Sequence, residues 1–138
     1  ITIHAQSFSG TPLGVAATHA TMDVIRDEKL CENAEKMGEY IMKRLIDLME
    51  TYQCIGDVRG LGLLLGVEIV KNREKKTPDP EMASRICGEA FKRGLFVLNM
   101  GSYGGKALRI APPLIINEEQ VDKSLEILEE SMRVAQGL

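Results

Sequence analysis

Four segments of the chain carry apolar residues at intervals of three and four positions, which is the spacing of one face of an α-helix. They run over residues 12–26, 28–51, 80–93 and 117–135. Thr11 and Asp79 each stand as a polar N-cap before a proline, and Asn117 with Gln120 forms a capping box. Gly94 ends the third segment as the glycine that follows a helix. The pattern therefore predicts four helices.

Two of these segments carry a long apolar stripe. In the second segment the stripe comprises Leu30, Ala34, Met37, Ile41, Leu45 and Leu48, and in the last it comprises Val121, Leu125, Leu128, Met132 and Ala135. Such stripes face the core of a globular domain. The first segment is instead rich in glycine, alanine and threonine, which permit close approach of another element. We therefore expect the first helix to be buried between two bodies of protein.

The period changes between the helical segments, where short apolar runs predict strands. These cover residues 55–59, 63–70, 95–98 and 107–111, and the first two are joined around Gly60-Leu61-Gly62. Residues 72–78 and 101–105 are polar or rich in glycine and predict exposed loops. The order of elements favours an α+β fold of two layers (α/β two-layer). It predicts a small, mainly antiparallel sheet of three to four strands covered by helices on one face.

Composition excludes several classes of function. The 138 residues are 44% hydrophobic and 27% charged with a net charge of −3, which is typical of a globular domain. There is no basic patch and aromatic content is 4%, so nucleic-acid binding is not expected. No apolar run approaches the roughly 18 residues of a membrane-spanning helix. The sparse cysteines, three in number, favour reduced thiols in the cytoplasm, and the two histidines have no metal-ligand spacing.

The strand that contains Arg109 is the most informative chemical feature. Alternation puts Leu108 and Ile110 on one face and Ala107, Arg109 and Ala111 on the other, before two prolines stop the strand. An arginine on a rigid strand between methyl-sized neighbours is suited to bind a carboxylate, because its donors form a fixed fork. A solvated arginine on an edge strand is the alternative.

A second candidate lies at the start of the first helix, in the segment from Ser7 to Pro12. Hydroxyl groups and backbone amides at a helix N-terminus can bind an anion such as phosphate. The same residue types also serve as ordinary helix caps, so the spacing alone leaves both interpretations open. No nucleophile with a paired base is evident in the sequence.

Four motifs, taken in order, resemble one enzyme family. They are residues 4–13 (HAQSFSGTPL), residues 57–63 (DVRGLGL) with 66–68 (GVE), residues 93–95 (RGL), and residues 108–110 (LRI) with 112–114 (PPL). This ordered set is similar to the class III pyridoxal-phosphate-dependent aminotransferases, the group of 4-aminobutyrate and ornithine aminotransferases. The chain also begins with Ile1 rather than methionine, and we interpret it as an excerpt from a longer protein.

The resemblance implies the C-terminal small domain of a fold-type-I enzyme. Residues 1–28 are then a segment and helix leading from a missing N-terminal large domain, and residues 29–138 form the small domain. The position of Ser7 implies binding of the phosphate of pyridoxal 5'-phosphate in the neighbouring subunit of a homodimer. The position of Arg109 implies binding of a substrate carboxylate. Ser7 replaces the commoner threonine, and Thr11 replaces asparagine.

The resemblance also implies what this chain lacks. The family's cofactor-binding lysine, the acidic residue facing the pyridine nitrogen and the main phosphate loop all lie upstream of Ile1. We therefore expect no catalytic residue and no bound cofactor in the fragment alone, which is expected to be inactive.

The implied reaction of the full-length protein is a transamination in the cytoplasm. An amino group would move from an amino acid or ω-amino acid, such as 4-aminobutyrate, to a 2-oxo acid such as 2-oxoglutarate. A pyridoxal-phosphate amino-acid racemase or aminomutase of the same family is one alternative, because the C-terminal motifs separate these enzymes poorly. A non-catalytic α+β interaction module is the other.

Overall fold

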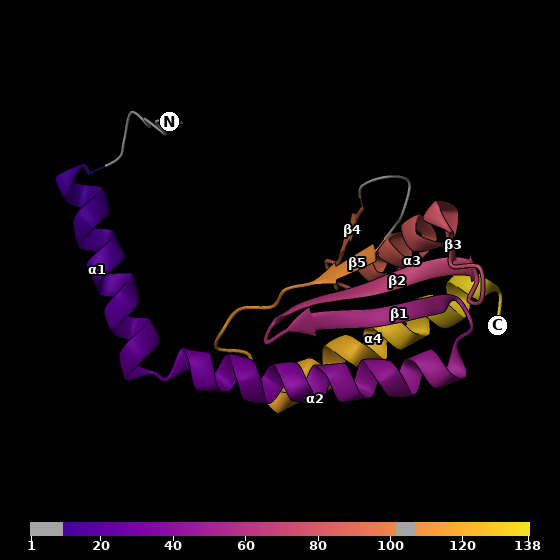
Figure 1. The fold of residues 1–138 in the computed structure, drawn as a ribbon, viewed down its shortest axis with the longest axis horizontal. Coiled ribbons are helices and arrows are strands. Elements are labelled where there is room, and N and C mark those ends of the chain that lie inside the picture. Colours follow the sequence, from indigo (N-terminus) through magenta and orange to yellow (C-terminus); the bar gives the residue numbers. More distant parts are fainter. Residues whose placement is uncertain (1–9, 102–106) are drawn as a thin grey trace.

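The computed structural model describes residues 10–101 and 107–138 of the chain. Its helices and strands follow one another as drawn in Figure 1: α1 (Pro12–Asp27), α2 (Leu30–Thr51), β1 (Ile55–Leu61), β2 (Leu64–Asn72), β3 (Thr77–Pro78), α3 (Pro80–Lys92), β4 (Leu98–Met100), β5 (Ala107–Ile110) and α4 (Glu118–Gln136). Ser7 lies outside the described residues, as does the segment 102–106.

The sheet confirms the predicted α+β architecture. Its strands lie in the order β1-β2-β5-β4 with antiparallel neighbours, and the two-residue strand β3 pairs with β2 off this path. Helices α2, α3 and α4 and the inward residues of the sheet form one apolar cluster. The helices therefore cover one face of the sheet and leave the other face open.

The core is built from the period-two alternation of β2 and β5. Leu65, Val67, Ile69 and Leu108 point toward the helices and are almost fully buried. The predicted helix stripes meet them: the buried members are Leu30, Met37, Ile41 and Leu45 of α2, and Val121, Leu125, Leu128, Met132 and Ala135 of α4. Burial of such side chains contributes about 1.5–3 kcal/mol each, so the strand alternation and the helix stripes stabilise the fold together.

The helix caps also confirm the sequence signals. The Asp79 carboxylate accepts a hydrogen bond of 3.0 Å from the Met82 amide. The Asn117 side chain accepts from the Gln120 amide at 2.9 Å, while the Asn117 amide donates to Gln120 Oε1 at 3.2 Å. Gly94 follows α3 with φ +84°. Each cap satisfies backbone groups that a helix end leaves unpaired.

Several predicted element boundaries are wrong. The first hairpin turns at residues 62–63 rather than around Gly60-Leu61-Gly62, because Gly60 and Leu61 pair with Leu65 and Leu64. Helix α2 begins at Leu30, not at residue 28, because Lys29 adopts a left-handed conformation with φ 53° between the first two helices. The strand expected at residues 95–98 lies at Leu98–Met100 instead. The amide of Leu95 donates to the Ala90 carbonyl, so this residue completes the end of α3 before the strand begins.

The predicted exposed loop at residues 72–78 is partly ordered by the rest of the fold. Thr77–Pro78 forms β3 against β2. The Arg73 guanidinium donates to the carbonyl groups of Ile55 at 3.0 Å, Met49 at 2.5 Å and Tyr52 at 2.9 Å. This side chain thus ties the end of α2 and the start of β1 to the segment that follows β2.

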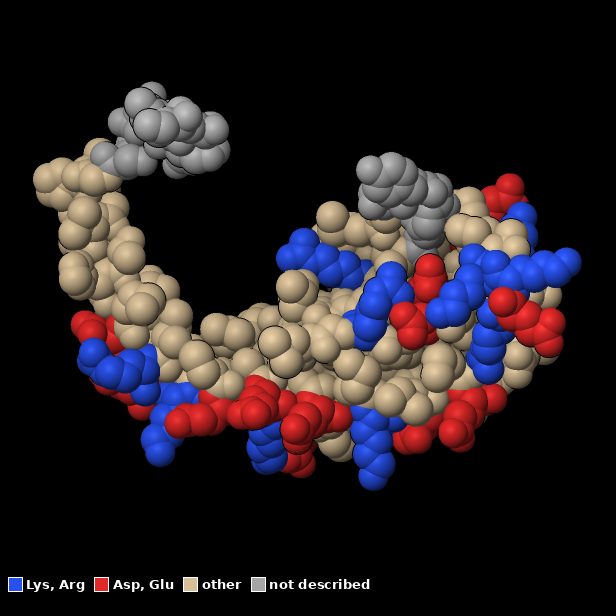
Figure 2. All heavy atoms as spheres, in the orientation of Figure 1, with Lys and Arg blue, Asp and Glu red and all other residues tan. Residues whose placement is uncertain are grey.

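Helix α1 projects away from the body of the molecule (Figure 1), and none of its residues is buried. Leu13 is 83% exposed and Met22 is 60% exposed. Figure 2 shows uncharged surface over most of this helix, with charged side chains gathered near its junction with α2. The expected burial of this helix is thus not found among the described residues. The large domain that the sequence analysis expects to cover it stays a prediction.

Helix α2 and the turn between β1 and β2 pack with their backbones in contact. A Cβ atom at Gly38 would overlap the carbonyl group of Gly62. Gly62 has φ +52°, as a glycine at the first position of a two-residue hairpin loop requires. The two glycines let the hairpin lie directly on the helix.

Replacing Gly38 by alanine is expected to destabilise the domain by about 1–3 kcal/mol, because backbone atoms have to move. Gly88 in α3 is the matched control, since an added Cβ there meets nothing within 4 Å. Gly88→Ala is expected to stabilise by about 0.5–1 kcal/mol. Urea unfolding followed by circular dichroism measures both. Equal effects of the two substitutions would mean that Gly62 does not constrain α2.

Candidate functional site

Charged side chains gather on the open face of the sheet. Cross-strand pairing sets the outward residues in two rows: Arg59, Gly66, Arg109 and Leu98 form one row, and Asp57, Glu68, Ala107 and Met100 form the next. The rows cross β1, β2, β5 and β4 in that order. A face with these charges, on a sheet whose other face is apolar, is the candidate functional site.

Arg109 lies where the sequence predicts it, on the outward side of β5. Its backbone pairs with Gly66 on one side and Leu98 on the other, and the residue is exposed. Among the described residues its guanidinium donates one hydrogen bond, to the Met100 sulfur at 3.7 Å. Within the described residues, no carboxylate lies within ion-pair distance of it. A charged fork of donors without an anionic partner is suited to bind a carboxylate.

Arg59 lies on the same face but in a different charge environment. Its Nη1 atom is 2.6 Å from the Asp57 carboxylate and 3.4 Å from the Glu68 carboxylate. The hydrogen bond that Arg59 donates to the Asp57 carboxylate raises the pKa of Arg59, and Glu68 adds to this effect. Two arginines therefore share one face, and only one of them is engaged by acidic side chains of the described residues.

The sequence analysis missed this second arginine as part of the site. A usable signal was present, because Asp57 and Arg59 alternate with Val58 along one strand. Antiparallel pairing around the two-residue loop at residues 62–63 then brings Glu68 opposite Asp57. The three charges thus converge through the register of one hairpin.

An apolar pocket of about 290 Å³ lies beside Arg109. Its walls include Phe96, Pro112, Ile116 and Leu125, so it runs from the end of β5 toward α4. Arg109 is one of the lining residues, and most of the others belong to the helix side of the sheet. Apolar walls of this kind fit an apolar part of a small molecule.

The described residues do not include the expected phosphate ligand. Ser7 precedes them, and Thr11 caps the start of α1 with its hydroxyl 3.4 Å from the Gly14 amide. In residues 10–101 and 107–138, no cluster of three histidine, cysteine or acidic side chains could hold a metal ion. Over the same ranges no helix has the length and apolar character needed to cross a membrane.

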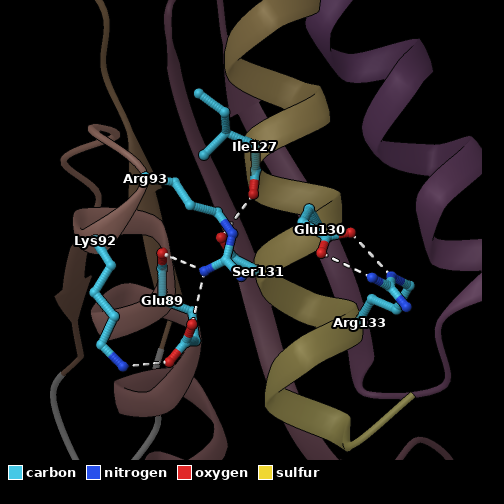
Figure 3. Close-up of polar contacts among 7 residues, drawn as sticks. All are labelled: Glu89, Lys92, Arg93, Ile127, Glu130, Ser131 and Arg133. Atoms are coloured by element: carbon cyan, nitrogen blue, oxygen red, sulfur yellow. Dashed lines mark hydrogen bonds and ion pairs between the residues drawn. The ribbon is translucent and has the colours of Figure 1, made fainter.

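The motif residue Arg93 has a structural role at the junction of α3 and α4 (Figure 3). Its guanidinium donates to the Glu89 carbonyl at 2.9 Å and to the Glu89 carboxylate at 2.6 Å. Lys92 also donates to this carboxylate, at 2.6 Å. Figure 3 shows Arg93 beside the turn of α4 where the buried Ser131 hydroxyl donates to the Ile127 carbonyl. Arg93 thus lies at the C-terminal end of α3, where this helix packs against α4.

The chain is similar to known proteins along nearly its whole length. The family model for class-III aminotransferases matches residues 1–132. An alanine/serine racemase of Pyrococcus horikoshii is 45% identical over 91% of this chain, and a leucine/methionine racemase of Thermococcus litoralis is 40% identical over 94%. A probable 4-aminobutyrate aminotransferase of Bacillus subtilis is 35% identical over 92%.

Solved structures give the same result for the fold. An amine transaminase from an uncultivated Pseudomonas species, in a form with bound pyridoxal phosphate, superposes on 98% of this chain with a TM-score of 0.86 and 30% identity. The chain spans 26% to 29% of the length of the three curated relatives and 30% of that structure. It therefore corresponds to somewhat less than a third of such a protein.

The ion pairs at the end of α3 predict a pH-dependent contribution to stability. Lys92 first, and then Arg93, lower the pKa of Glu89 below its usual 4.5. A carboxylate with a lowered pKa stabilises the folded state above its unfolded pKa, and this contribution is lost as the pH falls through the folded pKa. Glu89→Gln is therefore expected to lower the melting temperature at neutral pH and to have no effect in strong acid.

Thermal unfolding of wild type and variant across this pH range measures the effect. Glu126→Gln on exposed α4 surface is the control, because no ion pair joins Glu126 to another described residue. A difference between wild type and Glu89→Gln that persists unchanged into acid would contradict the assignment.

Proposed function

Because this chain belongs to the class-III aminotransferase family, we propose that the protein containing it binds the carboxylate of an amino-acid substrate through Arg109. Pyridoxal phosphate is the cofactor of full-length enzymes of this family, and one matched transaminase contains it. The observation that carries the proposal is the exposed Arg109 guanidinium, which has no carboxylate partner within the described residues.

When bound, the cofactor supplies the electron-withdrawing group that weakens the bonds at Cα. The part of this chain is to bind and orient the substrate. Arg109 holds the carboxylate from a strand that is hydrogen-bonded on both sides, so the guanidinium starts from a rigid base. A charge-assisted contact of this kind is worth about 1.5–3 kcal/mol, and it also fixes the position of Cα.

The surroundings of Arg109 suit this role. Gly66 opposite it has no side chain, and a Cβ there would meet one atom within 4 Å, the Arg59 carbonyl oxygen at 3.9 Å. Ala107 lies in the next row on the same strand. These small residues leave room for a ligand over the guanidinium.

Amino transfer is one candidate reaction. It would move the amino group of an amino acid or ω-amino acid, such as 4-aminobutyrate, to a 2-oxo acid such as 2-oxoglutarate. The family and the Bacillus subtilis relative support it.

Racemisation of a neutral amino acid is the second candidate, and the relatives favour it. The proteins with 45% and 40% identity are an alanine/serine racemase and a leucine/methionine racemase, whereas the aminotransferase has 35%. Racemisation needs the same carboxylate anchor, so Arg109 serves either reaction.

The remaining proposals concern assembly. Residues 1–28 would lead from a large domain that packs on the unburied helix α1, and residues 29–138 would form the small domain. Ser7 would bind the cofactor phosphate of the neighbouring subunit in a homodimer. The free thiols of Cys31, Cys54 and Cys87 support a cytoplasmic location.

Arg109→Lys in the full-length enzyme is expected to raise KM for its amino acid about tenfold or more, because lysine cannot form the bidentate contact. Arg85→Lys on the exposed surface of α3 is the matched control and is expected to leave KM unchanged. Steady-state kinetics of both variants test the assignment. Unchanged KM in Arg109→Lys would remove Arg109 from the site.

Product analysis separates the two reactions. The full-length enzyme is incubated with L-alanine, first alone and then with added 2-oxo acid, and the products are resolved by chiral chromatography. Appearance of D-alanine without a 2-oxo acid is the result expected of a racemase. Amino transfer that depends on the 2-oxo acid, without change of configuration, would instead identify a transaminase.

A further inference from the structure

Next to Arg109, the open face carries a cluster of Asp57, Arg59 and Glu68 that the proposed role of Arg109 leaves unused. Glu68 is paired with Asp57 on one side and with Ala107, the neighbour of Arg109 in the next row, on the other. The side chains of Asp57 and Glu68 are 36% and 20% exposed, so both carboxylates are reachable yet partly shielded from water. Partial burial strengthens their electrostatic effect on a nearby ligand.

The spacing of the strands brings this cluster within reach of a ligand on Arg109. Arg59 and Arg109 flank Gly66 on either side of β2, as the strand order in Figure 1 shows. Neighbouring strands lie about 4.7–4.9 Å apart, which sets the two Cα atoms about 10 Å apart. The Arg109 guanidinium contacts Met100 on the β4 side. A five-carbon dicarboxylate that is held at one end by this guanidinium and lies across Gly66 would bring its second carboxylate to the cluster.

The cluster is unfavourable for that second carboxylate for two reasons. Asp57 and Glu68 contribute two negative charges against the single positive charge of Arg59, so its net charge is negative. The Arg59 guanidinium, the other arginine of these two rows, is already paired with both carboxylates at 2.6 Å and 3.4 Å. A second anionic group would meet repulsion and an occupied partner.

We propose that Asp57, Arg59 and Glu68 form a specificity cluster that restricts the carboxylate site at Arg109 to substrates with a single carboxylate. This inference rests on the proposed role of Arg109. It names neutral amino acids and monocarboxylic 2-oxo acids as the substrate class, and it disfavours glutamate and 2-oxoglutarate. Release of Arg59 from its two partners converts the face into a receptor for dicarboxylates.

Competitive inhibition by pentanoate and glutarate tests the cluster in the full-length enzyme, because these acids have equal length and differ in one carboxylate. Wild type is expected to bind pentanoate about three- to tenfold more tightly than glutarate. The variant Asp57→Asn with Glu68→Gln is expected to bind glutarate about tenfold more tightly than wild type does, with less than about a twofold change for pentanoate. Adding Arg59→Gln to this variant is expected to abolish the increase in affinity for glutarate.

Glu130→Gln is the matched control, since it removes a carboxylate paired with Arg133 at the far end of α4 and is expected to leave both inhibition constants unchanged. Glu68→Gln alone is the milder variant should the double substitution fail to fold, and it is expected to give a smaller shift in the same direction. If the ratio of the inhibition constants of glutarate and pentanoate is the same in wild type and in these variants, the proposed role of the cluster is wrong.

The outcomes also separate this inference from the role of Arg109. Suppose that Arg109→Lys weakens pentanoate binding but the cluster variants leave the inhibition constants of both acids unchanged. The proposed role of Arg109 is then supported, and the proposed specificity cluster is wrong. If neither acid competes with substrate, or if Arg109→Lys leaves pentanoate binding unchanged, the proposed carboxylate site at Arg109 is wrong. The proposed specificity cluster, which rests on that site, is then wrong as well.

Discussion

The antiparallel pairing of β2 with β1 on one side and β5 on the other is the constraint on which the rest of this structure depends. The side chains of β2 alternate, so Leu65 and Val67 enter the core while Gly66 and Glu68 lie on the open face. A slip of one residue would exchange these two sets and bury Glu68. The apolar core therefore fixes the register, and the register places Arg59 and Arg109 on either side of Gly66. Packing on one face of the sheet thus determines the geometry of the site on the other.

Local signals in the sequence predict what local physics decides. The alternation around Arg109 gives its face correctly, and the polar-proline pairs give the starts of α1 and α3, because a strand period and a helix cap each involve a few neighbouring residues. The start of β4 is decided by contacts between distant elements, since Leu98 pairs with Arg109 across the sheet. The three carbonyl partners of Arg73 likewise come together only in the fold, so no pattern within residues 72–78 could reveal them.

The candidate site divides in the same way. Arg109 is predictable because one strand defines it. The Asp57–Arg59–Glu68 cluster is predictable only in part: alternation puts Asp57 and Arg59 on one face, but Glu68 joins them only when the hairpin register is known. Two arginines with the same side chain thus have different chemical capacity, and the difference lies in their neighbours. Acidic partners satisfy the guanidinium of Arg59, whereas that of Arg109 contacts a thioether sulfur among the described residues and retains its capacity for an anion.

The proposed role of Arg109 in holding the substrate is compatible with a domain that racemases and aminotransferases share. Both reactions act on the bonds at Cα, so in the proposed function both can use the same arginine on the same strand to fix this carbon. Under the two proposals made above, Arg109 sets which end of the substrate is held, and the charges beside it set which carboxylic acids are accepted. Neither determines what happens to the amino group or the proton at Cα. The choice of reaction must therefore depend on groups other than Arg109 and its sheet neighbours, which agrees with the similarity of this one domain to proteins with both kinds of activity.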